Sequence, residues 1–273
     1  MNKRKTPRPD TPRAPRPAKG RAPQTHWLWG GHAVMGALSN PQRRLERLVL
    51  AHETAESWSP RIDPLVAGRS DLPRGWEVMG RADLERLVGR QAVHQGVALL
   101  ATPAPQPDLD EVLDRLDPES PATIVLLDQV SDPQNVGAVL RSAAAFGAEA
   151  VVTTERHAPG ETGALAKAAS GGLDVVPFLH VTNLARSLDA LTTAGFWTLG
   201  LAGEGSVPLQ GERHAERTAL VMGAEGSGLR RLTRERCDRL VHLPTRGVIA
   251  DLNVSNAAAV ALYELLGRGR DAG

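Results

Sequence analysis

From Thr123 onward the sequence alternates between short apolar runs and helical patterns, and this alternation constrains the fold more than any other feature. Residues 123–128, TIVLLD, are apolar up to the final aspartate, as expected of a parallel strand buried on both faces. Further strands are predicted at 150–153, 175–181, 197–201, 219–222 and 240–243, and helices at 135–146, 163–169, 184–194 and 229–237. The pattern predicts an α/β domain with a doubly wound parallel sheet between two layers of helices.

In such sheets ligands bind beyond the carboxyl ends of the strands, so the loops at that edge are the candidate site. The first loop reads DQVSDPQNVGAVLRSAAAFGA over 128–148. Asn135 is expected to cap the helix that follows, and Gly137 to allow another backbone to approach closely. On structural grounds alone, Arg141 is interpreted as a solvated or ion-paired side chain.

The second loop, LVMGAEGSGL at 220–229, joins a strand to a helix through three glycines. A glycine-rich turn in this position is typical of phosphate or dinucleotide binding. Here the spacing is GxxGxG rather than GxGxxG, and Glu225 puts a carboxylate where a phosphate would lie. The carboxylate favours a ligand that carries a sulfonium or an amino group.

The third loop leads from Leu243 into a C-terminal helix, through Pro244 and the segment ADLNVSNAAAVALYELL. Asn253 and Ser255 are residue types that satisfy the free N–H groups of a helix start. Apolar residues then recur at helical spacing as far as residue 266. This spacing predicts a capped helix packed on the core.

Together the three loops resemble the three motifs of the SpoU-type RNA 2'-O-methyltransferases, in the order in which that family has them. The matching segments are DPxNxGAxxRxAxxFG, MGAEGSGL and NVSNAAAVALYE, all within 123–266, and KAASGGLDVVPF at 167–178 is a smaller match. The resemblance implies a SPOUT domain whose C-terminal segment forms a deep trefoil knot. It also implies S-adenosylmethionine as cofactor and a homodimer with a site completed at the interface.

The resemblance assigns roles to particular residues. Those that it places in the catalytic centre are Asn135, Arg141, Glu225 and Asn253. Those that it places against the cofactor are Gly223, Gly228, Leu243, Leu252 and Ser255. Arg141 is often assigned as the base in this family, but a guanidinium with a pKa above about 12 hardly ever loses its proton. Anchoring a phosphate or stabilising a developing alkoxide suits it better. Asp251 departs from the family, which usually has serine there.

Residues 26–102 form a smaller alternating α/β unit, with strands predicted at 45–52, 77–79 and 94–102, a helix at 81–88 and loops over 57–73. WGGHAV near its start and HQGVAL near its end resemble the RNA-binding domain that precedes many SpoU-type catalytic domains. Residues 103–121 hold five prolines and many acidic residues, which predicts a linker. The methyltransferase domain is then expected over 122–273.

Residues 1–25 carry eight basic side chains and one acidic side chain, a net charge of +7 in a chain whose total is +1. The segment is rich in proline and poor in large apolar residues, so a disordered basic tail is predicted. Such arms commonly add affinity for nucleic-acid phosphates, although a purely solubilising extension has the same composition.

Composition excludes several classes of protein. No apolar run is long enough for a membrane span, and the N-terminus lacks the apolar block of a secretory signal. A single cysteine, Cys237, excludes an internal disulfide and a multi-cysteine metal site, so no metal is expected. We therefore predict a cytoplasmic protein.

The functional prediction is S-adenosylmethionine-dependent 2'-O-methylation of ribose, with a guanosine of 23S ribosomal RNA as the substrate. The additional N-terminal domain resembles the ribosomal RNA branch of the family more than the shorter transfer RNA enzymes. The alternatives are a transfer RNA 2'-O-methyltransferase and a non-catalytic RNA-binding or ribosome assembly factor. A nucleotide-dependent oxidoreductase fits least, because no GxGxxG follows Leu127.

Overall fold

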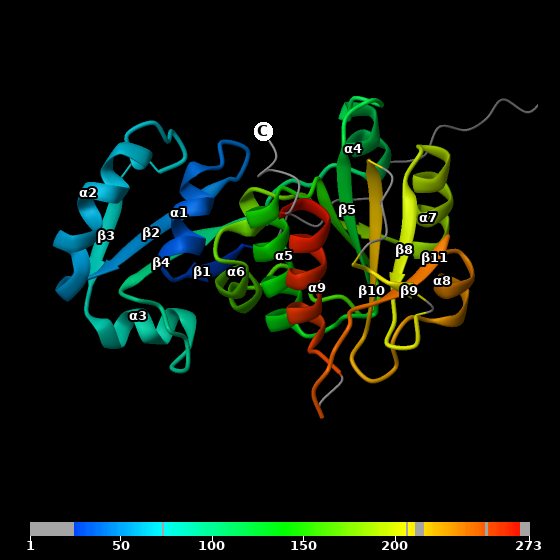
Figure 1. The fold of residues 1–273 in the computed structure, drawn as a ribbon. Helices are drawn as coiled ribbons and strands as arrows, with labels where there is room; N and C mark the ends of the chain where they lie inside the picture. Colours follow the sequence, from blue (N-terminus) through cyan, green and yellow to red (C-terminus); the bar gives the residue numbers. More distant parts are fainter. Residues whose placement is uncertain (1–24, 73, 206, 211–215, 249–250, 268–273) are drawn as a thin grey trace, which may run out of the picture.

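Two sheets lie side by side in the computed structural model, which describes residues 25–72, 74–205, 207–210, 216–248 and 251–267 (Figure 1). The first sheet belongs to an N-terminal module, residues 26–101, and the second to a C-terminal module, residues 122–267. All but the last residue of the basic tail predicted at 1–25 lies outside the described residues.

The N-terminal module contains a mixed sheet of four strands. Its elements are β1 (His26–Trp29), α1 (Gly31–Ser39), β2 (Leu45–Ala51), η1 (His52–Thr54), α2 (Ala55–Val66), β3 (Trp76–Met79), α3 (Arg81–Val88) and β4 (Val97–Ala101). The strand order is β1-β4-β2-β3, in which β4 pairs antiparallel with both neighbours and β2 pairs parallel with β3. The segment between the modules contains α4 (Leu109–Arg115), which buries Leu109 and Val112 against the second sheet.

The C-terminal module contains a sheet of seven strands, all paired in parallel, in the order β7-β6-β5-β10-β8-β11-β9. Its elements are β5 (Ala122–Asp128), α5 (Pro133–Phe146), β6 (Ala150–Thr154), α6 (Gly163–Ala169), η2 (Gly172–Asp174), β7 (Phe178–Val181), α7 (Leu184–Thr193), β8 (Trp197–Leu201), β9 (Val207–Pro208), β10 (Arg217–Gly223), α8 (Arg231–Glu235), β11 (Arg239–His242), α9 (Val254–Leu262) and the π-helical turn η3 (Tyr263–Gly267). The predicted parallel sheet is thus confirmed.

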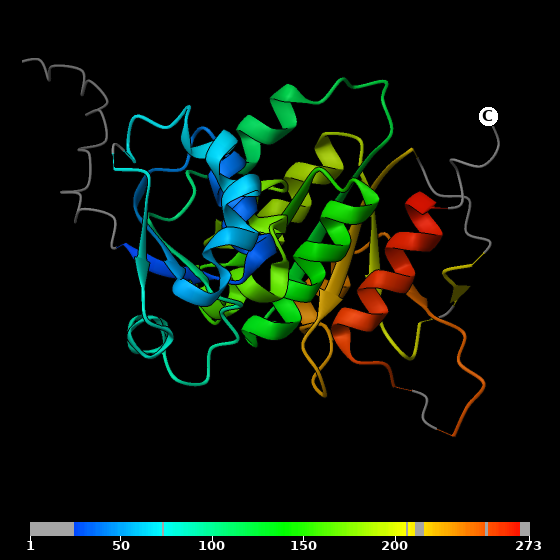
Figure 2. The ribbon, with the colours of Figure 1, turned by 90° about the vertical axis from the view of Figure 1, so that its left-hand side faces the viewer.

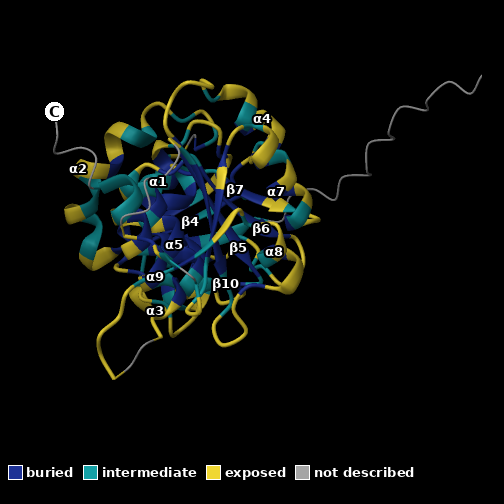
Figure 3. Ribbon diagram, turned by 45° about the vertical axis from the view of Figure 1, so that its right-hand side comes forward, coloured by how far each residue is buried: buried dark blue, intermediate teal, exposed yellow. Residues whose placement is uncertain are grey.

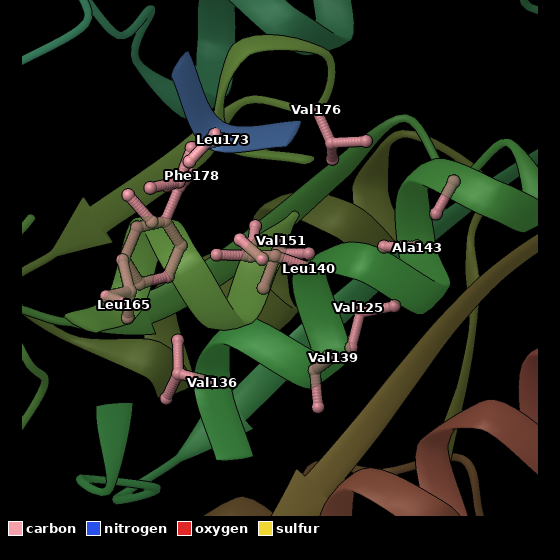
Figure 4. Packing of buried hydrophobic residues seen from close by; sticks show 14 of the residues in the cluster. Val125, Val136, Val139, Leu140, Ala143, Val151, Leu165, Leu173, Val176 and Phe178 are labelled. Carbon is pink, nitrogen blue, oxygen red and sulfur yellow. The ribbon is translucent and has the colours of Figure 1, made fainter. Parts of the chain in front are cut away.

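Strand β5 shows why its sequence is apolar throughout. Val125 and Leu127 point into the core beneath α5 and α9, whereas Ile124 and Leu126 point into the core beneath α4 and α7. Successive side chains of a strand face opposite sides of the sheet, so a strand covered on both sides needs no polar position. Figure 4 shows the first of these cores, and Figure 3 shows the buried strands beneath exposed loops.

One element was predicted wrongly. The segment expected to be loop over 57–73 begins with the helix α2, which contains Pro60 and Pro64. Proline removes a backbone donor and disfavours a helix interior. Here Ile62 is completely buried, and Trp58 and Leu65 pack on the same core at helical spacing. Burial of this apolar face outweighs the cost of the two prolines.

Another difference concerns the strand predicted at 175–181, which begins only at Phe178. The short helix η2 occupies Gly172–Asp174 just ahead of it. The strand therefore has four residues rather than seven.

Gly137 on α5 confirms the close approach of backbones that its residue type predicts. A Cβ there would lie 2.5 Å from Ala168 Cβ and 2.8 Å from the carbonyl oxygen of Leu165, both on α6. We expect Gly137→Ala to lower the free energy of unfolding by about 1–3 kcal/mol, because the two helices must separate. Urea denaturation measures this difference.

The control is Gly160→Ala, because no atom of the described residues lies within 4 Å of a Cβ added at Gly160. Alanine is otherwise favoured over glycine in a helix by about 1 kcal/mol. An unchanged or higher urea midpoint for Gly137→Ala would therefore contradict the helix contact.

Candidate active site at the carboxyl ends of the strands

A cleft of about 590 Å³ opens where β8, β10 and β11 end. This volume is in the usual range for a small-molecule site. The loops that follow the three strands supply most of its lining, at 201–204, 222–228 and 251–254. Of the residues predicted to bind the cofactor, those that line the cleft are Gly223, Gly228, Leu243 and Leu252. Ser255 is not part of the lining and lies on the first turn of α9.

The glycine-rich loop after β10 is folded tightly on itself. The N–H of Gly228 donates to the carbonyl of Ala224 at 2.9 Å, and Gly228 adopts a left-handed φ of 63°. A Cβ at Gly223 would lie 2.2 Å from the carbonyl carbon of Gly228. Only glycine at position 223 allows the two ends of the loop to come this close.

Three side chains from the three predicted loops meet beside this cleft. Asn135 Nδ2 donates to Glu225 Oε1 at 3.2 Å, and Asn253 Nδ2 donates to Asn135 Oδ1 at 3.0 Å. Asn253 Nδ2 also donates to Glu225 Oε1. These residues, hereafter the amide–carboxylate triangle, are separated by 28 to 118 positions in sequence. The structure therefore brings together three of the four predicted catalytic residues.

The orientation of the triangle is fixed by the helix that follows it. Asn253 Oδ1 accepts from the N–H of Ser255 at 2.9 Å and from its hydroxyl at 2.6 Å, so it caps α9 as predicted. Turning the amide over would remove both bonds and point oxygen at the Glu225 carboxylate. The Asn253 amide group therefore has one favourable orientation, which leaves its nitrogen to donate to Glu225 and Asn135.

The predicted role of Asn135 as a helix cap is wrong. Asp132 caps α5 instead, because its Oδ1 accepts from the N–H of Gln134 at 2.9 Å. Asn135 lies within the first turn of the helix. Its amide is thereby free to form the contact with Glu225, which is 90 residues away in sequence.

Asp128 and Arg230 support this site, although neither was among the predicted site residues. Asp128 is completely buried at the end of β5, opposite Gly223 in the strand register. Its carboxylate accepts from the N–H of Arg230 at 2.9 Å and from Arg230 Nε at 2.6 Å. Asp128 therefore anchors both ends of the glycine-rich loop. An acidic residue that ends a buried strand was the signal that could have revealed it.

The SpoU rRNA Methylase family profile matches residues 122–263, which is more than half of the chain. The chain belongs to this family. A second profile, for RNA 2'-O ribose methyltransferase substrate binding, matches residues 27–107.

SpoU-family relatives match almost the full length of the chain. A 23S rRNA (guanosine-2'-O-)-methyltransferase RlmB from Pseudomonas syringae pv. tomato is 40% identical, over 89% of this chain and 96% of its own. The RlmB of Ralstonia nicotianae is 46% identical over 87% and 93%. Among solved structures, the SpoU methyltransferase AviRb from Streptomyces viridochromogenes in complex with AdoMet has a TM-score of 0.73 at 22% identity, over 91% of both chains. An RNA 2'-O ribose methyltransferase has a TM-score of 0.71 at 24% identity, over 90% of this chain and 89% of its own. These structures confirm the SpoU fold.

The charges around the cleft of this SpoU-family chain are mainly negative. Glu204, Glu225 and Asp251 line it together with one cation, Arg234, which is paired with Glu204. The hydrogen bond from Arg234 holds the pKa of Glu204 below its usual range. Asp251 has no hydrogen-bond partner among the described residues. The cleft therefore favours a ligand with positive charge.

Arg141, the fourth predicted catalytic residue, does not join the triangle within one chain. It is exposed on α5, six residues beyond Asn135, which is about 9 Å further along the helix axis. Its side chain forms no hydrogen bond or ion pair with any described residue. The single chain thus holds an incomplete version of the predicted site.

The described part of the chain offers neither a metal site nor a membrane-spanning helix. It contains no group of three or more histidine, cysteine, aspartate or glutamate side chains that could hold a metal ion, and no helix long and apolar enough to cross a membrane. Cys237 follows α8 rather than lying within it, and burial raises the pKa of its thiol to about 12. The thiol is therefore protonated at neutral pH and is a poor nucleophile.

Proposed function

We propose that this protein transfers a methyl group from S-adenosylmethionine to the ribose 2'-hydroxyl of a guanosine in 23S ribosomal RNA. The observation that carries the proposal is the amide–carboxylate triangle beside an acidic cleft, in a chain whose relatives of nearly equal length are named as such enzymes. Its site of action would be the cytoplasm, where bacterial ribosomal RNA is found.

The cleft has groups that suit S-adenosylmethionine. Met222, Leu243 and Leu252 offer apolar surface for an adenine ring. The carboxylates of Asp251 and Glu225 face the same space and suit the ammonium and sulfonium groups. When bound, the cofactor supplies a methyl carbon attached to a positively charged sulfur, so the reaction requires alignment of the attacking oxygen more than a covalent intermediate.

The triangle is suited to hold the attacking hydroxyl. Glu225 uses Oε1 for both amides, and its Oε2 has no partner among the described residues. We assign Oε2 the role of accepting the hydrogen bond of the ribose 2'-hydroxyl, which orients an oxygen lone pair. Asn135 and Asn253 hold the carboxylate in position by donating to Oε1.

We also propose that a second copy of the chain completes the site. Helices α5 and α9 lie side by side (Figure 2), and Phe146 packs edge-to-face on Tyr263 with ring centroids 6.1 Å apart. Tyr263 is 52% exposed and Val260 is 48% exposed, so this face retains apolar surface. In a two-fold dimer through these helices, Arg141 of the partner subunit would approach the cleft. There it would bind a phosphate or stabilise the alkoxide.

The trefoil knot and the domain limits stay predictions.

Mixing two inactive variants tests whether Arg141 acts across the dimer. Arg141→Ala and Glu225→Gln should each be nearly inactive alone. After random reassociation the mixture should recover about one quarter of the wild-type rate, because half of the dimers are mixed and each mixed dimer has one intact site. If Arg141 acted within its own chain, no activity would return. Analytical ultracentrifugation of the wild type checks the dimer itself.

Methyl transfer from labelled S-adenosylmethionine to unmodified 23S ribosomal RNA and to transfer RNA tests the function, with nucleoside mass spectrometry as the readout. We expect 2'-O-methylguanosine from ribosomal RNA only. Product from transfer RNA alone would keep the chemistry and replace the substrate. Absence of both product and cofactor binding would favour a non-catalytic assembly factor.

A further inference from the structure

Arg43 is a buried guanidinium, only 1% exposed, at the contact between the two modules. It lies between α1 and β2 in the N-terminal module, but its charge is met by carboxylates of the C-terminal module. Arg43 Nε donates to Asp174 Oδ1 at 2.7 Å, and Nη1 donates to Glu161. Nη1 also donates to the carbonyl of Thr102 at 3.2 Å. One side chain therefore binds both modules.

The same two carboxylates receive further bonds from the N-terminal side. Asn40 Nδ2 donates to Asp174 Oδ1 at 3.1 Å, and the N–H of Ala104 donates to Glu161 Oε2 at 3.1 Å. His26 Nε2 lies 3.2 Å from Glu161 Oε1. Arg43, Glu161 and Asp174 are hereafter the Arg43 network.

Besides this network, the two modules share a closely packed apolar contact. One buried cluster includes Leu28 of the N-terminal module together with Leu165 of the C-terminal module. A Cβ added at Gly36 would lie 2.9 Å from the Cα of Gly171 across the contact. Packing this close does not allow the modules to slide past each other without loss of contact.

The network contributes orientation more than stability. Removing charges from water is costly, and a buried ion pair often stabilises a protein no more than apolar side chains of similar volume. Burial acts to raise the pKa of both carboxyls. It prevails at Asp174, whereas the proximity of His26 and Arg43 holds the pKa of Glu161 below its usual value. Any shifted arrangement of the modules would leave a buried charge unpaired, so one arrangement is selected.

We propose that the Arg43 network determines which nucleotide is methylated, by holding the RNA-binding module in a single orientation relative to the cleft. The proposal rests on the proposed function. RNA bound to the N-terminal module would present its chain to the amide–carboxylate triangle from a fixed direction and distance. A single ribose hydroxyl would then reach Glu225. Arg43 is in this sense a positioning residue.

Replacing Arg43 by methionine tests the proposal, since it removes the charge and keeps much of the volume. We expect the dissociation constants for S-adenosylmethionine and for RNA to stay within about twofold, and kcat to fall by about 10- to 100-fold. Mass spectrometry of nuclease fragments should then show methyl groups on additional nucleotides. The control is Arg115→Met, which removes an exposed ion pair with Glu111 on α4. A single modified nucleotide at a kcat within about twofold of the wild type would overturn the proposal.

A second variant and a second measurement keep the test decisive. If Arg43→Met does not fold, Asp174→Asn replaces it, with the same outcomes, because it removes one charge and preserves the shape of the side chain. Small-angle X-ray scattering without RNA reports the arrangement of the modules whether or not the enzyme is active. A larger radius of gyration for the variant supports the proposal, and identical profiles count against it. If the wild type transfers no methyl group at all, the proposed function fails and scattering alone decides the orientation.

Discussion

Replacing Glu225 by glutamine is expected to lower kcat for methyl transfer by about 100-fold or more, which is the usual scale for removing one preorganised catalytic group. The amide nitrogens of Asn135 and Asn253 both donate to Glu225 Oε1. A glutamine would either direct its own N–H₂ at these donors or lose the acceptor that faces the ribose. Asn253 has no favourable way to turn over, because its oxygen caps α9.

Steady-state kinetics with saturating RNA, together with calorimetric binding of S-adenosylmethionine, measures this effect. The dissociation constant of the cofactor should change much less than kcat, since most of the cleft lining is untouched. The control is Glu235→Gln, which removes an exposed carboxylate paired with Arg231 on α8. A Glu225→Gln enzyme with kcat within about threefold of the wild type would contradict the assigned role.

Gly223→Ala is expected to abolish cofactor binding. The added Cβ would lie 2.2 Å from the carbonyl carbon of Gly228 and 2.4 Å from the backbone nitrogen of Leu229. Backbone atoms cannot rotate away as a flexible side chain can, so the glycine-rich loop must open. Opening the loop would also pull Arg230 from Asp128, the contact that anchors the loop.

Calorimetry should show a loss of affinity for S-adenosylmethionine of at least about 100-fold, equivalent to about 3 kcal/mol. Gly203→Ala is a matched control, because Gly203 lines the same cleft and, among the described residues, an added Cβ there would meet only Asp251 Oδ1, at 4.0 Å. Retention of wild-type affinity by Gly223→Ala would mean that the loop tolerates an open form.

The local pattern of the sequence predicted most elements of the C-terminal module, because buried strands and amphipathic helices each have a period of their own. It also predicted Asn253 as a cap. It failed where a long-range contact decides the outcome. Helix α2 forms despite Pro60 and Pro64 because Ile62 is buried by residues distant in sequence.

The candidate site, too, was predicted only in part from the sequence. Motif resemblance named Asn135, Glu225 and Asn253, but the hydrogen bonds between them span 28 to 118 residues, and no local pattern contains such contacts. The Arg43 network spans 118 and 131 residues and matches no motif. Buried charged pairs of this kind are specified by the packing of two modules. A single sequence therefore does not distinguish Arg43 from other arginines.

The position of β10 in the sheet determines when the enzyme can fold during its synthesis. This strand lies between β5 and β8, yet it is made only at residues 217–223, after α5, α6, α7 and five of the other strands of its sheet. Until it leaves the ribosome, β5 has an unpaired edge and the apolar groups facing β10 remain open to water. A nascent chain of about 200 residues therefore exposes an unpaired strand edge and apolar surface, which are the features that promote aggregation of folding intermediates. The centre of the sheet can close only after residue 223 has been made.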